Sequence, residues 1–295
     1  MNTPPRITVG IPFFNAQDTL RAAIHSVLAQ TFEDWELLLV DDGSRDNSLL
    51  IARSFENSRI KLLTDNQNRG LVARLNQIAR TARGQYVARM DADDIMHPDR
   101  LAKQVRYLDQ NPSVDVVGSW AYEIDGQGIP YGLRTTELKP DAAAVLESGL
   151  FIHPTVTGKR DWFINNPYNP EFIRCEDREL WVRTFELSKF DIIREPLLFY
   201  REHDRFRIEA YLASRKSNRR LFLQRGPALV GWRRTLTLTA KNHAQAALFK
   251  IASSSGLANR LIRLRGVKIS PGQRREAEAA LARVRVNEPD VQRHS

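Results

Sequence analysis

The sequence predicts an α/β fold in which helices cover both faces of a mostly parallel sheet. Four short apolar runs alternate with segments of helical periodicity over the first third of the chain. The connections are short, and a strand-helix-strand order of this kind implies parallel strands joined by right-handed crossovers. Polar residues follow directly where the apolar runs end. These three observations indicate the fold class.

The first third of the chain is expected to supply four strands and three helices. Trp35–Val40 is apolar almost throughout, as strands buried on both faces of a parallel sheet tend to be. The first helix is predicted by apolar residues from Leu20 to Leu28 that recur at helical spacing. The expected strands are Arg6–Phe14, Trp35–Val40, Arg59–Thr64 and Gln85–Met90, and the expected helices are Ala16–Gln30, Asp46–Phe55 and a segment from Gly70 to Arg83.

The later part of the chain has a less regular pattern. A helix is predicted from Pro98 to Gln110, because Asn111-Pro112 disfavours its continuation. Residues 130–175 contain scattered glycine, proline and asparagine. The further expected elements are the strand Val114–Ile124, a strand after Gly126-Gln127-Gly128, the helix Glu176–Leu187 and the closing strand Pro196–His203.

The composition limits the class of protein. Hydrophobic residues make up 42% of the chain and charged residues 27%, which is typical of a soluble globular protein. The single cysteine, Cys175, excludes an internal disulfide framework and favours a reducing compartment. The N-terminal residues lack the plan of a secretory signal, and no run of about 18 uncharged apolar residues is present. We therefore expect a cytoplasmic protein without a membrane-spanning helix.

The net charge of +9 is divided unevenly along the chain. Residues 1–200 carry 23 Lys and Arg against 28 Asp and Glu, whereas residues 201–295 carry 21 against 7. The two parts therefore have net charges of −5 and +14. We predict a folded domain over residues 1–205 and a basic, mainly helical extension over residues 206–295 that meets an anionic partner.

Three carboxylates follow the fourth apolar run. Asp91, Asp93 and Asp94 come directly after Gln85–Met90, and Pro98 lies shortly beyond. Because ligands of open parallel sheets bind at the carboxyl ends of the strands, acidic residues there are placed for chemistry. Mg²⁺ and Mn²⁺ bind through carboxylates together with substrate phosphates. The alternative is an acidic turn that caps the helix after Pro98.

Polar residues also follow the other three expected strands. Asn15 follows the first strand, Asp41-Asp42 the second and Asn68-Arg69 the third. In one parallel sheet these points converge on the same rim, although each alone is compatible with an ordinary turn. The chain contains neither G-x-G-x-x-G after the first strand nor G-x-x-x-x-G-K-[ST]. A metal is therefore the natural partner for a diphosphate at this rim.

The motifs at these strand ends occur in an order and spacing similar to those of family 2 glycosyltransferases. The resemblance rests on Val9–Asn15, Val40–Ser44, Asn68–Gly70, Asp91–Asp94, Glu176-Asp177 and Tyr200–His203. It covers residues 6–205 and implies the GT-A fold, a Rossmann-like, mostly parallel sheet flanked by helices. It also implies an inverting, metal-dependent transfer from a nucleotide-diphosphate sugar. The donor nucleotide would be UDP, GDP or dTDP, and the metal would be Mn²⁺ or Mg²⁺.

The resemblance further implies a nucleotide-sugar site at the rim. The residues expected to contact the nucleotide sugar are Pro12, Phe14, Asn15, Asp41, Asp42, Arg69, Asp91 and Ala92. Pro12 and Phe14 would lie near the base, which either Asp41 or Asp42 would hydrogen-bond. Asp93 would ligate the metal. Asp94 is the weaker candidate for a ligand, because adjacent carboxylates on a strand point to opposite faces.

The acidic pair Glu176-Asp177 resembles the catalytic pair of the family, with Asp177 as the base and Glu176 beside it. A carboxylate there would take the proton of the acceptor hydroxyl while the metal stabilises the departing diphosphate. A single displacement with one base gives inversion. His153, Arg201 and His203 would contact the acceptor or the diphosphate. The alternative for Glu176-Asp177 is a helix N-terminus favoured by acidic residues, which is compatible with the catalytic role.

The expected acceptor is a saccharide or a lipid-linked sugar in cell-surface polysaccharide or lipopolysaccharide assembly. The chain lacks the Gln-x-x-Arg-Trp motif of the family's processive synthases, so we expect transfer of a single sugar. Residues 130–175 are expected to shape the acceptor side. The basic extension either rests on the anionic inner surface of a membrane or forms a solvated helical subdomain that covers the body.

Two other classes of function remain open. A nucleotidyltransferase that makes sugar nucleotides also uses a parallel sheet and metal-binding carboxylates, but its Gly-rich, basic N-terminal loop is missing. A nucleic-acid-binding protein would use the positive charge of residues 201–295. Few aromatic residues alternate with the arginines there, and the acidic rim would repel phosphates. No nucleic-acid partner is therefore expected.

Overall fold

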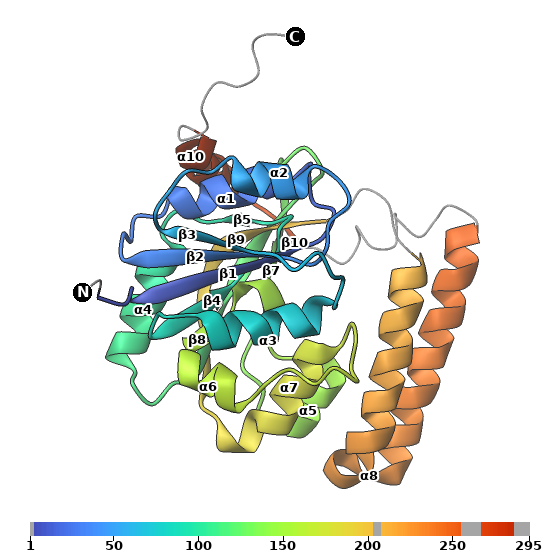
Figure 1. Ribbon diagram of the computed structural model, residues 1–295. Coiled ribbons are helices and arrows are strands. Elements are labelled where there is room, and N and C mark those ends of the chain that lie inside the picture. The colour runs from blue at the N-terminus through green and yellow to red at the C-terminus, as the bar shows by residue number, and fades with distance from the viewer. Residues whose placement is uncertain (1–2, 203–207, 255–266, 286–295) are drawn as a thin grey trace.

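The fold is built on one sheet with a parallel centre. The computed structural model describes residues 3–202, 208–254 and 267–285 (Figure 1). Within these residues ten strands form a single sheet, ordered β10-β7-β6-β8-β4-β1-β2-β3 along its main path, with β9 paired to β5 and β6. Helices lie on both faces of the sheet, which confirms the predicted α/β class.

The predicted parallel strands form the first half of the sheet. They are β1 (Ile7–Phe13), β2 (Trp35–Asp41), β3 (Ile60–Leu63) and β4 (Tyr86–Arg89). β1 pairs in parallel with β2 and β4, and β2 pairs in parallel with β3. In β2, Leu37 packs into one core cluster and Leu38 into another. Because both faces of β2 are buried, its sequence is apolar without alternation.

Three helices connect these strands. α1 (Leu20–Leu28) and α2 (Ser48–Arg53) lie on one face of the sheet, and α3 (Leu71–Thr81) lies on the other (Figure 1). The Ile78 side chain of α3 packs on Gly10 of β1, where a Cβ atom would lie 2.4 Å from the isoleucine. This close approach fixes α3 against the centre of the sheet, so the loops that precede α3 stay near the ends of β1 and β2.

Beyond β4 the sheet is mixed. β8 pairs antiparallel with β4 and β6, and β7 pairs antiparallel with β6 and β10. β9 is parallel to β6 and antiparallel to β5. These strands are β5 (Ile95–Met96), β6 (Val116–Ile124), β7 (Pro130–Arg134), β8 (Thr157–Lys159), β9 (Phe190–Arg201) and β10 (Val267–Lys268).

The helices of the second half surround an aromatic core. They are α4 (Arg100–Gln110), α5 (Ala142–Ser148), η1 (His153–Thr155), α6 (Arg160–Asn165), α7 (Glu176–Thr184), η2 (Phe185–Leu187) and α10 (Pro271–Arg285). Trp181 of α7 is fully buried and stacks on Trp162, with ring centroids 5.9 Å apart. Cys175 is a buried free thiol directly before α7. This packing fixes the start of α7.

Two predicted elements differ most from the observed ones in where they begin. The helix expected from Ala16 begins at Leu20, because the amides of Thr19 and Leu20 both donate to the Ala16 carbonyl in a turn. The closing strand expected from Pro196 begins earlier, at Phe190, because its first residues pair with β6. A local turn decides where the helix begins, whereas pairing with a distant strand decides where β9 begins.

A helical hairpin follows the sheet. α8 spans Ile208–Ser254 and is broken at Gly231, whose φ of 74° lies in the left-handed region. Its two arms stand side by side next to the body (Figure 1). The hairpin falls within residues 206–295, for which a basic, mainly helical extension is predicted, and residues 206–207, 255–266 and 286–295 of that range lie outside the described residues. Among the described helices, none is both long and apolar enough to cross a membrane. The domain boundary at residue 205 stays a prediction.

Candidate active site

The loops after β1 and β2 are tied together at the rim of the sheet. Phe14 and Asn15 follow β1 directly, and both are exposed. Asn15 adopts a left-handed φ of 50°. Its amide donates to Ser44 Oγ at 3.1 Å, and its side-chain oxygen accepts from the Arg45 amide at 2.8 Å. The predicted nucleotide contacts Phe14 and Asn15 therefore lie at one rim, with the Phe14 ring open to solvent.

Pro12 and Asp41 are buried members of this rim. Pro12 lies within β1, opposite Val40 of β2. Asp41 accepts hydrogen bonds from the Ser44 amide and from Thr64 Oγ1, both at 3.0 Å. Asp41 thereby fixes the turn after β2 and joins it to the residue that follows β3.

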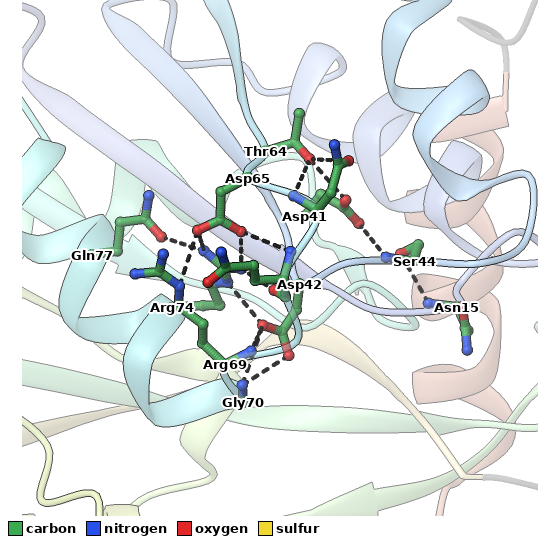
Figure 2. A network of polar contacts seen from close by, with 12 residues as sticks. Asn15, Asp41, Asp42, Ser44, Thr64, Asp65, Arg69, Gly70, Arg74 and Gln77 are labelled. Carbon is green, nitrogen blue, oxygen red and sulfur yellow. Dashed lines mark hydrogen bonds and ion pairs between the residues drawn. The ribbon is translucent and has the colours of Figure 1, made fainter.

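Asp42 joins the loop before α3 to a buried arginine (Figure 2). Its carboxylate accepts from the amides of Arg69 at 2.8 Å and Gly70 at 3.0 Å, and from Arg74 Nε at 2.8 Å. Arg74 is only 1% exposed and also pairs with Asp65 at 2.7 Å. Both oxygens of Asp42 are engaged by the protein. The structure thus gives Asp42 an anchoring role, which differs from the expected direct contact with the base.

Arg69 is held mainly through its backbone. Its side chain is about half exposed and pairs with Asp65 at 3.1 Å, four residues earlier. A surface pair of this kind contributes little to stability, so the guanidinium can exchange it for a ligand at small cost. The predicted nucleotide contact by Arg69 remains compatible with this position.

Asp91, Asp93 and Asp94 come together on a turn. β4 ends at Arg89, and the Asp94 amide donates to the Asp91 carbonyl, so these residues do not continue the strand. One oxygen from each of the three carboxylates lies within 4.8 Å of the others, and Ala92 is buried between them in the chain. The expectation that Asp94 points away from Asp93 is therefore wrong, because it assumed strand geometry.

This donor set fits a hard divalent cation. Mg²⁺ and Mn²⁺ take carboxylate oxygens, and three are available here. Asp94 is almost fully buried, and its Oδ2 has no hydrogen-bond partner. Burial, and then the charge of Asp93, raise the pKa of Asp94 well above its usual value. A buried oxygen of this kind gains from a cation, which supports Asp93 and Asp94 together as ligands.

Arg201 braces the acidic turn. Its amide donates to Asp94 Oδ1 at 2.9 Å, and its Nε donates to the Asp93 carbonyl at 2.8 Å. Its Nη1 reaches the carbonyls of Asp125 and Gly126 at 3.0 and 2.9 Å. The side chain predicted to contact acceptor or diphosphate is thus a support of the turn that carries the metal ligands. His203, predicted with it, lies outside the described residues.

Arg89 is a buried cation beside the acidic turn. It is the last residue of β4 and only 5% exposed, and its Nη2 pairs with Asp91 at 2.5 Å. Its Nε and Nη1 are buried without a hydrogen-bond partner. Glu176 is also buried, and its Oε2 likewise has none. The charges of Asp91, Asp94 and Glu176 all favour the charged form of Arg89. This arginine therefore links the metal-side carboxylates to the predicted catalytic pair.

Glu176 and Asp177 begin α7 as predicted. Arg174, two residues earlier, has a left-handed φ of 66°, so the chain turns sharply into the helix. Burial, and then the charge of Asp177, raise the pKa of Glu176 to about 7. Asp177 is less buried than Glu176. Burial, and then the charges of Asp93 and Asp177, raise the pKa of Asp91. The catalytic candidate Asp177 therefore lies within electrostatic range of the acidic turn.

His153 lies on the inner side of this array. Its Nε2 is 2.9 Å from the hydroxyl of Tyr168. Burial, and then the charge of Arg89, lower the pKa of His153 well below its usual value, so the imidazole is neutral. Burial raises the pKa of Tyr168. The predicted acceptor contact His153 is thus a neutral, hydrogen-bonded imidazole, whose ring centroid lies 6.4 Å from that of Trp181 of α7.

Three further residues were missed at the sequence level. The sequence could have identified Arg89, because it is a lone arginine inside an apolar run next to three carboxylates. Arg100 is buried without any ion pair among the described contacts and donates to the carbonyls of Arg89 and Pro154, both at 2.9 Å. Tyr168 comes from the irregular region 130–175. No local pattern marks Arg100 or Tyr168, because their roles depend on contacts between distant segments.

A rim of this kind, on a mixed sheet with a parallel centre, is the architecture of a glycosyltransferase of the GT-A type. Solved structures match the fold. TarS of S. aureus, residues 1–349, in complex with UDP-GlcNAc has a TM-score of 0.60 at 15% identity and covers 96% of this chain and 82% of its own. A mannosyltransferase from Pyrobaculum calidifontis in complex with GDP-Man and Mn²⁺ has a TM-score of 0.57 at 18% identity over 96% of this chain and 86% of its own. The chain spans 39% of a longer TarS structure.

The chain belongs to glycosyl transferase family 2, whose model matches residues 8–180. Its relatives include EpsE, a putative glycosyltransferase of Bacillus subtilis, with 34% identity over 63% of this chain and 69% of EpsE. WfgD of Escherichia coli, a UDP-Glc:alpha-D-GlcNAc-diphosphoundecaprenol beta-1,3-glucosyltransferase, is 32% identical over 60% of this chain and 68% of its own. The protein is therefore a glycosyltransferase.

Proposed function

We propose that the protein transfers a single sugar from a nucleotide-diphosphate sugar to an acceptor hydroxyl with inversion at the anomeric carbon. The observation that carries this proposal is the acidic turn, where oxygens of Asp91, Asp93 and Asp94 lie within 4.8 Å of one another beside the buried Arg89, which pairs with Asp91. A site for the diphosphate would thereby be held on the same side of the sheet as a carboxylate base at the start of α7. The complexes of similar folds with UDP-GlcNAc and GDP-Man support a nucleotide-sugar donor.

The rim after β1 and β2 would bind the nucleotide. Phe14 is exposed and offers an aromatic face, and Asn15 is fixed beside it by Ser44 and Arg45. Arg69 lies across this rim with a largely solvated guanidinium. Asp42 and Arg74 would hold the loop of Arg69 in place when the donor binds. UDP, GDP and dTDP remain the candidate nucleotides.

Asp93, Asp94 and Asp91 would hold a divalent cation, Mn²⁺ or Mg²⁺. When bound, the cation supplies Lewis-acid stabilisation of the negative charge on the departing diphosphate. The protein supplies the geometry of the site, because Arg201 fixes the turn and Arg89 pairs with Asp91 at 2.5 Å. The Mn²⁺ in the archaeal mannosyltransferase complex supports a metal in this fold.

Asp177 would act as the base. It would accept the proton of the acceptor hydroxyl as this oxygen attacks the anomeric carbon, a role that contributes about 10²–10⁴-fold to the rate. Glu176, whose pKa is about 7, would remain buried beside it and keep Asp177 oriented at the start of α7. One displacement with one base converts an α-linked donor into a β-linked product.

The acceptor is proposed to be a saccharide or a lipid-linked sugar of cell-surface polysaccharide or lipopolysaccharide assembly. The name of the relative WfgD specifies a diphosphoundecaprenol-linked acceptor, which supports this class. The single cysteine supports a cytoplasmic location, where thiols stay reduced. We place the protein at the inner face of the membrane, with its basic extension toward anionic lipid.

The donor class is tested by hydrolysis of UDP-, GDP- and dTDP-sugars with Mn²⁺, with Mg²⁺ and with a chelator. We expect one nucleotide to dominate and the chelator to abolish the activity. Asp93→Ala should lose cation-dependent donor binding in calorimetry, whereas the surface variant Asp161→Ala, remote from the rim, should bind as the wild type does. Cation-independent binding by Asp93→Ala at wild-type affinity would contradict the metal assignment.

A further inference from the structure

The second arm of α8, from Trp232 to Ser254, has two different faces. It folds back along the first arm, and the Tyr211 and Phe249 rings pack with centroids 4.6 Å apart. Arg215 donates to Gln245 at 2.8 Å between the same arms. The two arms therefore form one unit, and the outer surface of the second arm is free of the first (Figure 1).

The hairpin is fixed to the catalytic body through its inner side. Leu221 and Phe222 are buried in the same core cluster as Trp181 of α7. Arg225 reaches Glu179 of α7 at 3.4 Å. Arg234 and Glu147 of α5 pair at 2.7 Å. Because α7 begins with Glu176-Asp177, any surface that binds the hairpin is held at a defined position relative to the catalytic pair.

The outer side of the second arm carries an exposed apolar stripe. Its residues recur every third or fourth position, which places them on one helical face. They are Trp232, Leu236, Ala240, Ala244, Ala247 and Ile251. Trp232, Leu236 and Ile251 are 63%, 58% and 68% exposed. Leu238 and Phe249 face the opposite way and are buried. The exposed stripe is therefore not a part of the core of the described protein.

The charge around this stripe has one sign. α8 contains nine Lys and Arg and a single acidic residue, Glu209 at its start. The second arm has no acidic residue, and its Arg233, Lys241 and Lys250 are exposed. A second copy of the chain would bring an equally basic face against this one. A nucleic acid would be contacted by the cations but would leave Trp232 and Ile251 in water.

We propose that the outer face of the second arm lies on an anionic lipid bilayer. This face consists of the apolar stripe and its flanking cations. Basic helices with an apolar face bind at the boundary between headgroups and acyl chains, where tryptophan is favoured. Each cation near an anionic bilayer strengthens binding about fivefold. This inference deepens the proposed function, on which it rests for the lipid-linked class of acceptor.

The test uses the full chain and vesicles of phosphatidylcholine, with and without phosphatidylglycerol. We expect sedimentation with the anionic vesicles at low salt and release as salt increases. The double variant Trp232→Ser/Leu236→Ser should lower the partition coefficient at least tenfold, on the order expected for two exposed apolar side chains. The control Leu50→Ser/Leu187→Ser removes apolar residues that are 64% and 91% exposed on other elements, and should stay within about twofold.

Fluorescence locates the contact. Brominated lipid should quench part of the tryptophan emission of the wild type. Trp232→Phe should remove that quenching, because Trp35, Trp162 and Trp181 are buried and Trp120 is half-buried against the core of the body. The proposal is overturned if the wild type does not bind anionic vesicles, or if the Trp232→Ser/Leu236→Ser variant binds as tightly as the wild type. It is also overturned if that variant instead abolishes self-association or RNA binding while vesicle binding is absent.

The two proposals fail separately. Donor hydrolysis is measured without vesicles, and the Trp232→Ser/Leu236→Ser variant should retain it, because both residues are exposed, whereas the hairpin packs on the body through the buried Leu221, Phe222 and Leu238. Vesicle binding with no hydrolysis of any nucleotide sugar would remove the proposed function and leave a membrane-binding surface. Hydrolysis without vesicle binding would remove the membrane surface alone.

Discussion

The substitution Asp42→Asn tests whether this carboxylate anchors the loop before α3. Asp42 accepts from two amides and pairs with Arg74, which is 1% exposed. An asparagine oxygen can retain one of these bonds, but the charge that balances Arg74 is lost. Hydrogen bonds to charged groups contribute about 1.5–3 kcal/mol each, and breaking a buried pair costs about 3–5 kcal/mol. Because Arg74 keeps Asp65 as a partner, we expect a loss of about 2–4 kcal/mol in the free energy of unfolding.

The assay is urea unfolding followed by circular dichroism, with the slope of the transition checked for constancy. Asp41→Asn is the matched control, since Asp41 is equally buried but is bonded only by the Ser44 amide and the Thr64 hydroxyl. It should cost about 1 kcal/mol. If Asp42→Asn unfolds within about 0.5 kcal/mol of the wild type while donor affinity falls, Asp42 is a ligand of the nucleotide and the anchoring role is wrong.

Two predictions concern the buried charges, and one concerns the brace. The stability contribution of protonated Glu176 should be complete below its unfolded pKa of 4.5 and be lost as the pH rises through about 7, at most roughly 3 kcal/mol. The urea midpoint of the wild type should fall as the pH rises across this range, whereas that of Glu176→Gln should not. The same fall in Glu176→Gln would contradict this prediction. Arg89→Met should lower the free energy of unfolding by about 1.5–3 kcal/mol, because it removes the ion pair with Asp91, which is 31% exposed, and the cation near the buried Asp94 and Glu176. Arg89→Lys should recover part of this loss in thermal melts. Equal losses of stability in the two variants would show that the charge of Arg89 does not contribute to the stability. Arg201→Met should weaken Mn²⁺ binding in calorimetry, whereas Arg194→Met on the exposed part of β9 should not; equal effects would argue against the brace.

The parallel half of the fold could be predicted because β1, β2 and β4 are buried throughout, and only the edge strand β3 is partly exposed. Trp35–Val40 has no polar alternation, so the sequence itself marks a strand covered by two layers of helices. The helix between β1 and β2 could be predicted from the helical spacing of its apolar residues. The rim was predicted from the rule that ligands bind at the carboxyl ends of parallel strands. The same rule identified Asp91 and Asp93.

The second half depends on pairing between distant segments, which leaves little local signal. β8 is three residues long and pairs with both β4 and β6, which are distant in the sequence. Phe190 joins β9 because Val116 of β6 lies opposite, not because of its own neighbours. A short strand without alternation cannot be recognised before its partners are known.

The candidate site shows the same division. Asp177 and Asp93 could be named from motif spacing, whereas the position of Asp94 depended on a turn that replaces the expected strand. In the sequence Arg89 is a lone arginine in an apolar run, and this signal does not show whether its side chain is buried. Only the fold shows that it is buried, paired with Asp91 and close to Glu176. Charge networks of this kind are set by tertiary contacts and leave no periodic pattern.

The central claim is that Asp177 is the base in the sugar transfer, and that other residues at the rim bind the donor. The measurement that tests it most directly is the rate of sugar transfer by Asp177→Asn, with donor affinity determined in parallel by calorimetry. We expect a rate at least 10²-fold lower, on the scale of general-base catalysis, with the donor dissociation constant unchanged. Turnover at the wild-type rate would remove Asp177 from the base role and contradict the account.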